Sequence, residues 1–143
     1  MPRRKTKFVT GEYYQVVNRG VGGMKIFADE DDYSWFEQLV RKHRVGVQID
    51  VYALVANHFH FLLKQVSDVG IERFATSLQR AYTRYYNKKY KRRKLSLYQG
   101  RFWAERIADE DHYYKVLAYI LRNPGKHKMV NLGRDGRSGL MTG

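Results

Sequence analysis

Residues 57–63 read Asn57-His58-Phe59-His60-Phe61-Leu62-Leu63, and this alternation predicts a strand with two different faces. Successive side chains of a strand point to opposite sides, so His58 and His60 share one face while Phe59 and Phe61 share the other. The two histidines then lie about 7 Å apart along the strand. Two neutral imidazoles at this spacing can bind one divalent metal ion, and they can equally be ordinary histidines of a polar face.

The periodicity of apolar residues predicts strands and helices on both sides of this stretch. The predicted strands cover residues 13–18, 47–55, 58–66 and 98–107. The predicted helices cover residues 29–44, 69–90 and 109–123. The first six elements have the order of the β-α-β-β-α-β unit, so we expect an α+β protein with a ferredoxin-like antiparallel sheet and an added C-terminal helix.

The strand predicted at residues 47–55 is expected to be half-buried, with one apolar face. Its apolar residues alternate with polar ones and are Val47, Ile49, Val51, Ala53 and Val55. The turn that follows is predicted at Ala56 and Asn57, which makes the strand pair a hairpin.

Length and composition indicate one globular domain. The chain has 143 residues, of which 43% are hydrophobic, enough for a core of its own. We expect residues 1–130 to form this domain, and we expect the polar, glycine-rich residues 131–143 to be a flexible tail.

The absence of cysteine excludes disulfides, cysteine zinc sites and thiol catalysis. It also fits a reducing compartment. No apolar stretch is long enough for a signal peptide or a membrane span. The sequence therefore predicts a soluble cytoplasmic protein with no membrane partner.

The net charge of +13, from 27 basic and 14 acidic residues, predicts a polyanionic partner, and nucleic acid is the expected one. Clusters of acidic residues stand at two predicted helix starts, where they complement the helix dipole. The candidates for contact with DNA are Arg19, Lys64, Arg84, Lys88, Arg92, Arg93 and Arg101. Lys64 is expected on the face of the two histidines, or else as a solvated lysine at a strand end. Tyr82 and Tyr85, which stand among these cations, are expected in the core rather than stacked on bases.

The last predicted helix carries a second group of candidate residues. Tyr119 and Asn123 lie four residues apart on one flank of that helix, beside the apolar stripe that is expected to face the core. An amide oxygen is a suitable ligand for Mg²⁺ or Mn²⁺, and a tyrosine one turn earlier would lie beside the ion. An asparagine before Pro124 is also a common helix cap.

Together, residues 57–63 and Tyr119-Ile120-Leu121-Arg122-Asn123-Pro124 resemble the single-tyrosine HUH transposases. The resemblance is to the IS200-like family and especially to its REP-associated branch. Asn18-Arg19-Gly20 and Tyr98-Gln99-Gly100-Arg101-Phe102 extend it, and it spans residues 12–130. Gln15 is a departure, because relatives often have histidine there.

The resemblance implies a set of roles. His58, His60 and Asn123 would bind Mg²⁺ or Mn²⁺, and Tyr119 would attack single-stranded DNA flanked by hairpins to form a 5′-phosphotyrosine. When bound to DNA, such a protein would be associated with the nucleoid. It would work either as a homodimer with the tyrosine supplied in trans or as a monomer.

Two other functions fit the same sequence. One is a catalytically silent protein that binds hairpin or single-stranded nucleic acid. The other is an RNA-binding module on the same sheet, in which Phe59 and Phe61 would be exposed for stacking on bases.

Overall fold

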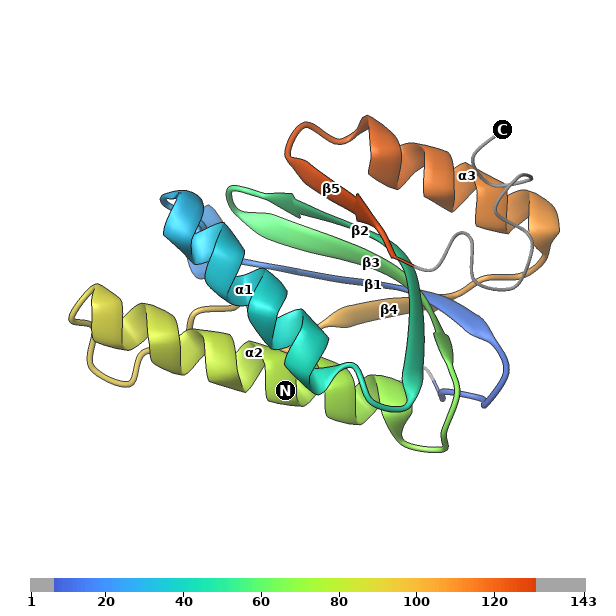
Figure 1. Cartoon of the computed structure of the whole chain (residues 1–143), viewed down its shortest axis with the longest axis horizontal. Coiled ribbons are helices and arrows are strands. Elements are labelled where there is room, and N and C mark those ends of the chain that lie inside the picture. The colour runs from blue at the N-terminus through green and yellow to red at the C-terminus, as the bar shows by residue number, and fades with distance from the viewer. Residues whose placement is uncertain (1–6, 131–143) are drawn as a thin grey trace.

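The computed structural model describes residues 7–130, in which helices cover both faces of a five-stranded antiparallel sheet (Figure 1). The strands are β1 (Tyr13–Arg19), β2 (Val47–Val55), β3 (His58–Gln65), β4 (Trp103–Arg106) and β5 (Lys126–Met129). The helices are α1 (Glu30–His43), α2 (Gly70–Lys89) and α3 (Glu110–Arg122), and a 3-10 turn, η1, covers Val21–Gly23. The predicted tail, residues 131–143, lies outside the described residues.

The strand order is β4-β1-β3-β2-β5. Its first four members form the β-α-β-β-α-β arrangement, so the predicted α+β, ferredoxin-like fold is confirmed. β5 pairs with β2 and was not predicted. Its four residues, Lys-His-Lys-Met, are mostly exposed and have no apolar alternation, as is common for a short edge strand. Within residues 7–130, no helix is long and apolar enough to cross a membrane.

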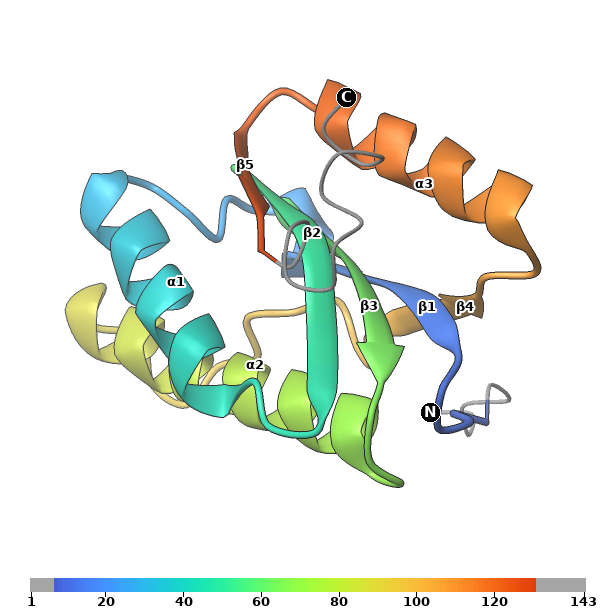
Figure 2. The same ribbon diagram turned by 45° about the vertical axis from the view of Figure 1, so that its right-hand side comes forward.

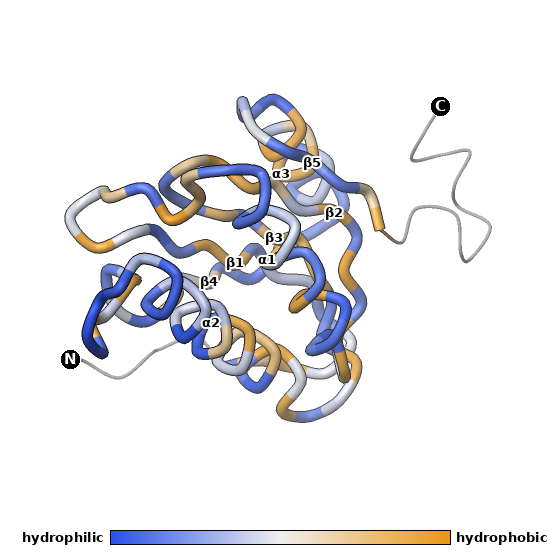
Figure 3. Tube along the Cα trace, turned by 60° about the vertical axis from the view of Figure 1, so that its left-hand side comes forward, coloured by the Kyte–Doolittle hydropathy of each residue, from blue (hydrophilic) through white to orange (hydrophobic). Residues whose placement is uncertain are grey.

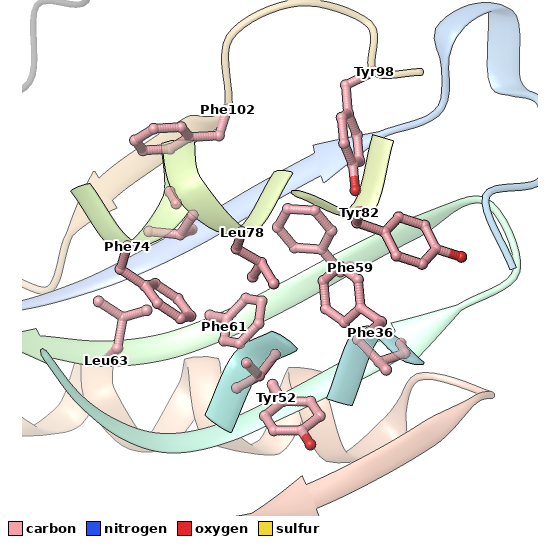
Figure 4. Close-up of a cluster of buried hydrophobic side chains, with 14 of the residues drawn as sticks. Phe36, Tyr52, Phe59, Phe61, Leu63, Phe74, Leu78, Tyr82, Tyr98 and Phe102 are labelled. Atoms are coloured by element: carbon pink, nitrogen blue, oxygen red, sulfur yellow. The ribbon is translucent and has the colours of Figure 1, made fainter. Parts of the chain in front are cut away.

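The phenylalanines of β3 belong to the core between the sheet and the helices α1 and α2. Phe59 and Phe61 are each 1% exposed and pack with Phe36 of α1 and with residues of α2 such as Phe74 (Figure 4). They are therefore not the exposed stacking surface that an RNA-binding module would need. Apolar residues recur at helical spacing along α2, with hydrophilic residues between them (Figure 3). Tyr82 is fully buried, as predicted.

The prediction that residues 47–55 form one apolar face is wrong. The pairing of β2 with β3 shifts between Ile49 and Val51, which leaves Asp50 as an extra residue in β2. Ile49 therefore packs on the α1/α2 side with Tyr52 and Leu54, whereas Val51 packs on the opposite side. Both faces of β2 are buried, because α1 and α2 cover one and α3 covers the other.

Helix α3 covers the face of the sheet opposite to α1 and α2 (Figure 2). Its residues Val116, Leu117 and Ile120 pack on Val51, Ala53 and Leu62 of the strands. The helix begins after Asp109, whose carboxylate accepts a hydrogen bond from the backbone of His112 at 2.8 Å. It ends before Asn123, where the backbone becomes extended ahead of Pro124. The predicted bounds are thus met, and the flank with Tyr119 lies over β3.

Candidate active site

Two histidines of β3 and a tyrosine of α3 come together above the sheet. The rings of His58 and His60 have centroids 4.8 Å apart and are nearly perpendicular, at 83°. The ring of Tyr119 lies 5.4 Å from that of His60, at 82°. Tyr119 remains 51% exposed, so its side chain can be reached from solvent. The structure therefore brings together three of the predicted site residues.

His60 is a buried imidazole without a hydrogen bond. It is only 5% exposed, and neither ring nitrogen has a partner among residues 7–130. Burial, together with the nearby His58, lowers the pKa of His60 to about 4. The ring is therefore neutral at neutral pH, with a free lone pair. An unpartnered buried nitrogen is costly unless something binds it, and a metal ion fits this position.

The orientation of His58 is fixed by its neighbour Asn57. The Nδ1 atom of His58 lies 2.7 Å from the side-chain oxygen of Asn57, which can only accept a hydrogen bond. Nδ1 therefore carries the proton, and the lone pair on Nε2 is left for a metal ion. Burial and the charge of Arg19 lower the pKa of His58. The sequence predicted Asn57 only as a turn residue. Its position directly before His58, a candidate ligand, was the signal that it could also orient the His58 ring.

Asn123 lies one turn after Tyr119 and is both a helix cap and a possible ligand. Its amide nitrogen donates to the backbone oxygen of Tyr119 at 3.1 Å, while no described residue donates to its amide oxygen. No group of three His, Cys, Asp or Glu within residues 7–130 could hold a metal ion. A site here would therefore depend on two imidazoles and this amide oxygen, which is a donor set that Mg²⁺ or Mn²⁺ can use.

His127 was missed because β5 was not predicted. Its Nε2 atom makes a close contact with the backbone oxygen of Asn123. β5 thus supports the end of the helix that carries Tyr119.

Tyr119 also borders a cavity of about 420 Å³. The cavity is lined by Gln15, Val17, His60, Trp103, Lys115, Val116 and Tyr119. The sequence did not point to Trp103 or Lys115 as site residues. They come together only through the pairing of β1 with β4 and the packing of α3.

Of the basic residues predicted to contact DNA, two lie on the α3 side of the sheet. Arg19 is opposite His58 in the register of β1 and β3, so its charge lies beside the imidazole pair. Lys64 is four residues from His60 along β3, roughly 13 Å away. Its ammonium lies 5.7 Å from the ring centre of Tyr13. Lys64 therefore shares the predicted face but not the predicted site.

Most of the other basic candidates line a groove of about 1070 Å³ between α2 and residues 92–102. They are Arg84, Lys88, Arg92 and Arg101. Arg93 is exposed on the same loop but does not line the groove. Helix α2, which lines the groove, lies on the other side of the sheet from α3 (Figure 2).

Arg92 is held by contacts with the C-terminal end of α2 and with its own loop. Its guanidinium donates to the side-chain oxygen of Asn87 at 2.7 Å and to the backbone of Ser96 at 3.3 Å. It also lies 5.5 Å from the ring centre of Tyr86. Arg92 thus shapes the groove, whereas Arg84 and Lys88 face it without a salt bridge to a described acidic residue.

Comparisons with solved structures show the same fold in two proteins. A REP-associated tyrosine transposase bound to a REP hairpin matches with a TM-score of 0.65 and 18% identity, over 87% of this chain and 73% of the other. A protein of Deinococcus radiodurans described as a transposase matches with a TM-score of 0.56 and 14% identity, over 87% of this chain and 100% of the other. Comparison of the sequence with curated proteins gave no match.

The family comparison covers most of the chain. The family described as "Transposase IS200 like" matches residues 9–123, a range that includes both histidines of β3 and extends to Asn123. The fold, the arrangement of these residues and this match agree with one another, and the chain belongs to the IS200-like transposase family.

Proposed function

We propose that this protein cleaves and rejoins single-stranded DNA through a covalent bond to Tyr119. The observation that carries the proposal is the contact between the exposed Tyr119 and the buried, unpartnered imidazole of His60. A structural histidine would satisfy at least one ring nitrogen, whereas a ligand histidine keeps a lone pair for its metal ion.

In this reaction the phenol oxygen of Tyr119 attacks the phosphorus of a DNA phosphodiester. The bond from phosphorus to the 3′ oxygen breaks, the phenol proton is released and the 3′ oxygen takes up a proton. The products are a 5′-phosphotyrosine and a free 3′-OH. Because the new bond is also a phosphodiester, a second 3′-OH can reverse the step and join new ends without ATP.

His58, His60 and Asn123 are the residues that would hold Mg²⁺ or Mn²⁺. When bound, the ion would polarise the phosphate and stabilise negative charge on its oxygens. Burial lowers the pKa of both imidazoles, which favours the neutral form that ligation requires. Arg19, opposite His58, adds a positive charge beside the phosphate.

The groove along α2 is proposed to hold folded DNA. Arg84, Lys88 and Arg101 place positive charge along it. This charge favours binding of a phosphate backbone in the groove rather than elsewhere on the protein. The structural neighbour with the same fold is bound to a REP hairpin. A hairpin in this groove would leave its single-stranded flank free to pass around the sheet toward Tyr119.

The experiment that tests the proposal is a denaturing gel of protein mixed with labelled hairpin oligonucleotides from the flanks of its own gene. With Mn²⁺ we expect a protease-sensitive adduct with the fragment 3′ of the cut, and with EDTA we expect none. Tyr119→Phe removes the attacking oxygen, so adduct formation should fall by at least about 10³-fold, whereas hairpin binding should change only a few-fold.

The matched control is Tyr114→Phe, a half-buried tyrosine on the same helix, which should leave the adduct unchanged. An adduct that survives Tyr119→Phe would mean that another tyrosine is the nucleophile. Hairpin binding with no adduct under any condition would favour the catalytically silent binder.

A further inference from the structure

The cavity beside Tyr119 has a width set by the register of three strands. Val17 of β1 lies opposite His60 of β3 on one side and opposite Trp103 of β4 on the other. Neighbouring strands are about 4.8 Å apart, so the backbones of His60 and Trp103 are about 10 Å apart, with Val17 between them as the floor. Val116 of α3 closes one side. The space between the walls suits a flat ring.

Trp103 forms one wall and is unusually exposed for its size. It is 52% exposed on the edge strand, and no described ring stacks on it. The chain's other tryptophan, Trp35, is 45% exposed but stacks on Tyr85 with ring centroids 4.9 Å apart. An exposed indole without a partner provides a surface on which an unpaired base can stack.

Gln15 contributes an amide that has no partner in the protein. It is 8% exposed and lines the cavity, and its side chain forms no hydrogen bond with any residue from 7 to 130. The amide atoms are not sealed off from solvent, so water in the cavity can bind them and a ligand there can replace that water. The edge of a nucleobase offers a donor next to an acceptor, which is what a glutamine amide can pair with.

The groove and the cavity have lining residues that are neighbours in the sequence at the start of β4. Arg101 and Phe102 line the groove, and the next residue, Trp103, lines the cavity. A DNA strand that leaves the groove around the β4 edge therefore reaches Trp103 before it reaches Tyr119. Lys115, at the rim of the cavity, adds a positive charge near the same path.

We propose that this cavity binds one unpaired base of the DNA strand next to the phosphate that Tyr119 attacks. The base stacks on Trp103, and its edge pairs with the amide of Gln15. This inference rests on the proposed cleavage of single-stranded DNA. It adds that the protein itself, through Trp103 and Gln15, selects the base beside the cleaved phosphate.

Two single-tryptophan proteins test the proposal. Trp35→Phe leaves Trp103 as the only tryptophan, and Trp103→Phe leaves Trp35. Each is titrated in EDTA and low salt with labelled dA8, dC8 and dT8 and with an abasic strand of equal charge, while anisotropy of the label reports binding. We expect saturable quenching of Trp103 by at least one of the base-containing strands and none by the abasic strand. The emission of Trp35 should not change.

The role of Gln15 is tested with Gln15→Leu in the Trp35→Phe background. The preference among the three strands should fall by about tenfold, because the leucine cannot pair with a base edge. The melting temperature should not fall, because the amide has no partner in the protein. An unchanged preference, or a marked loss of thermal stability, would overturn the assignment of Gln15.

The outcomes separate this inference from the proposed function. Strands that bind without quenching Trp103, strands that fail to bind, or equal quenching by the abasic strand would overturn the base pocket, even if the adduct to Tyr119 forms. Base-dependent quenching without an adduct would support the pocket and count against the covalent chemistry.

Discussion

At the scale of single residues, burial decides what His60 can do. A histidine on an exposed polar face would be partly protonated near neutral pH, whereas burial keeps His60 neutral and leaves both of its nitrogens without partners. The sequence placed His60 on the correct face but could not show how deeply α3 covers it. The unpartnered nitrogens of His60 suit a metal ion, but without metal their burial lowers the stability of the fold.

That cost gives a pH dependence of stability. The pKa of His60 is lowered from 6.5 to about 4, so between these values the unfolded chain binds a proton that the folded chain does not. The free energy of unfolding therefore falls as the pH falls from 6.5 toward 4. Without metal, we expect His60→Gln to remove about 2 kcal/mol of the loss between pH 7 and pH 5.

Urea denaturation of the two proteins at both pH values measures this difference. Metal is kept out with EDTA, so that only protonation is compared. An identical loss of stability in His60→Gln and the natural protein would show that His60 is not buried as the structure has it.

At the scale of secondary-structure elements, one buried carboxylate of α1 joins this helix to the end of α2. Asp32 is fully buried in the first turn of α1 and accepts hydrogen bonds from Tyr85 and Tyr90, each at 2.6 Å, and from the backbone of Ala28 at 2.9 Å. The ammonium of Lys89 lies 2.9 Å away. The sequence shows Asp32 as one of the acidic residues clustered at a predicted helix start, but it did not predict the two tyrosine partners, which are more than 50 residues away.

Asp32→Asn should therefore destabilise the fold. Burial by itself would raise the pKa of Asp32, but the hydrogen bonds from Tyr85, Tyr90 and Lys89 lower it to about 2. The carboxylate contributes stability above about pH 4, and this contribution is lost as the pH falls through 2. We expect Asp32→Asn to lower the free energy of unfolding by about 3 kcal/mol at pH 7.

The control is Asp31→Asn, at an exposed position of the same helix turn. It should change stability by less than about 0.5 kcal/mol. Chemical denaturation gives both values, and equal effects of the two substitutions would contradict a special role for Asp32.

At the scale of the whole molecule, α3 meets β3 of its own chain. The contact between Tyr119 and His60 is made within one polypeptide, so a monomer can assemble the proposed active site. The short strand β5 follows α3 and pairs with β2, which fixes the end of the helix to the same sheet. We therefore propose that the tyrosine acts in cis.

Mixing two inactive variants tests this arrangement. His60→Gln lacks a ligand and Tyr119→Phe lacks the nucleophile, so each should form no adduct by itself. If the site is assembled within one chain, the mixture should also form none. Recovery of the adduct on mixing, seen on the same denaturing gel, would show that the tyrosine is supplied in trans.

The sequence by itself determined the elements and the family-like motifs. Periodicity gave the helices and the first three strands of the ferredoxin-like unit, because an apolar face must be buried wherever the chain forms such an element. The strand predicted at residues 98–107 was too long, since only Trp103–Arg106 pair with β1 as β4. It also placed His58 and His60 on one face and Tyr119 and Asn123 on one flank, because these spacings are local. β5 was missed, since four mostly polar residues have no periodicity to read.

Only the tertiary structure decided what depends on contacts between distant segments. The irregularity at Asp50 changed which residues of β2 face which layer, because the shift exists only in the pairing with β3. The register of β1 with β3 and β4 placed Gln15 and Trp103 beside Tyr119. These positions follow from strand pairing and helix packing across the whole chain, and local spacing carries no information about them.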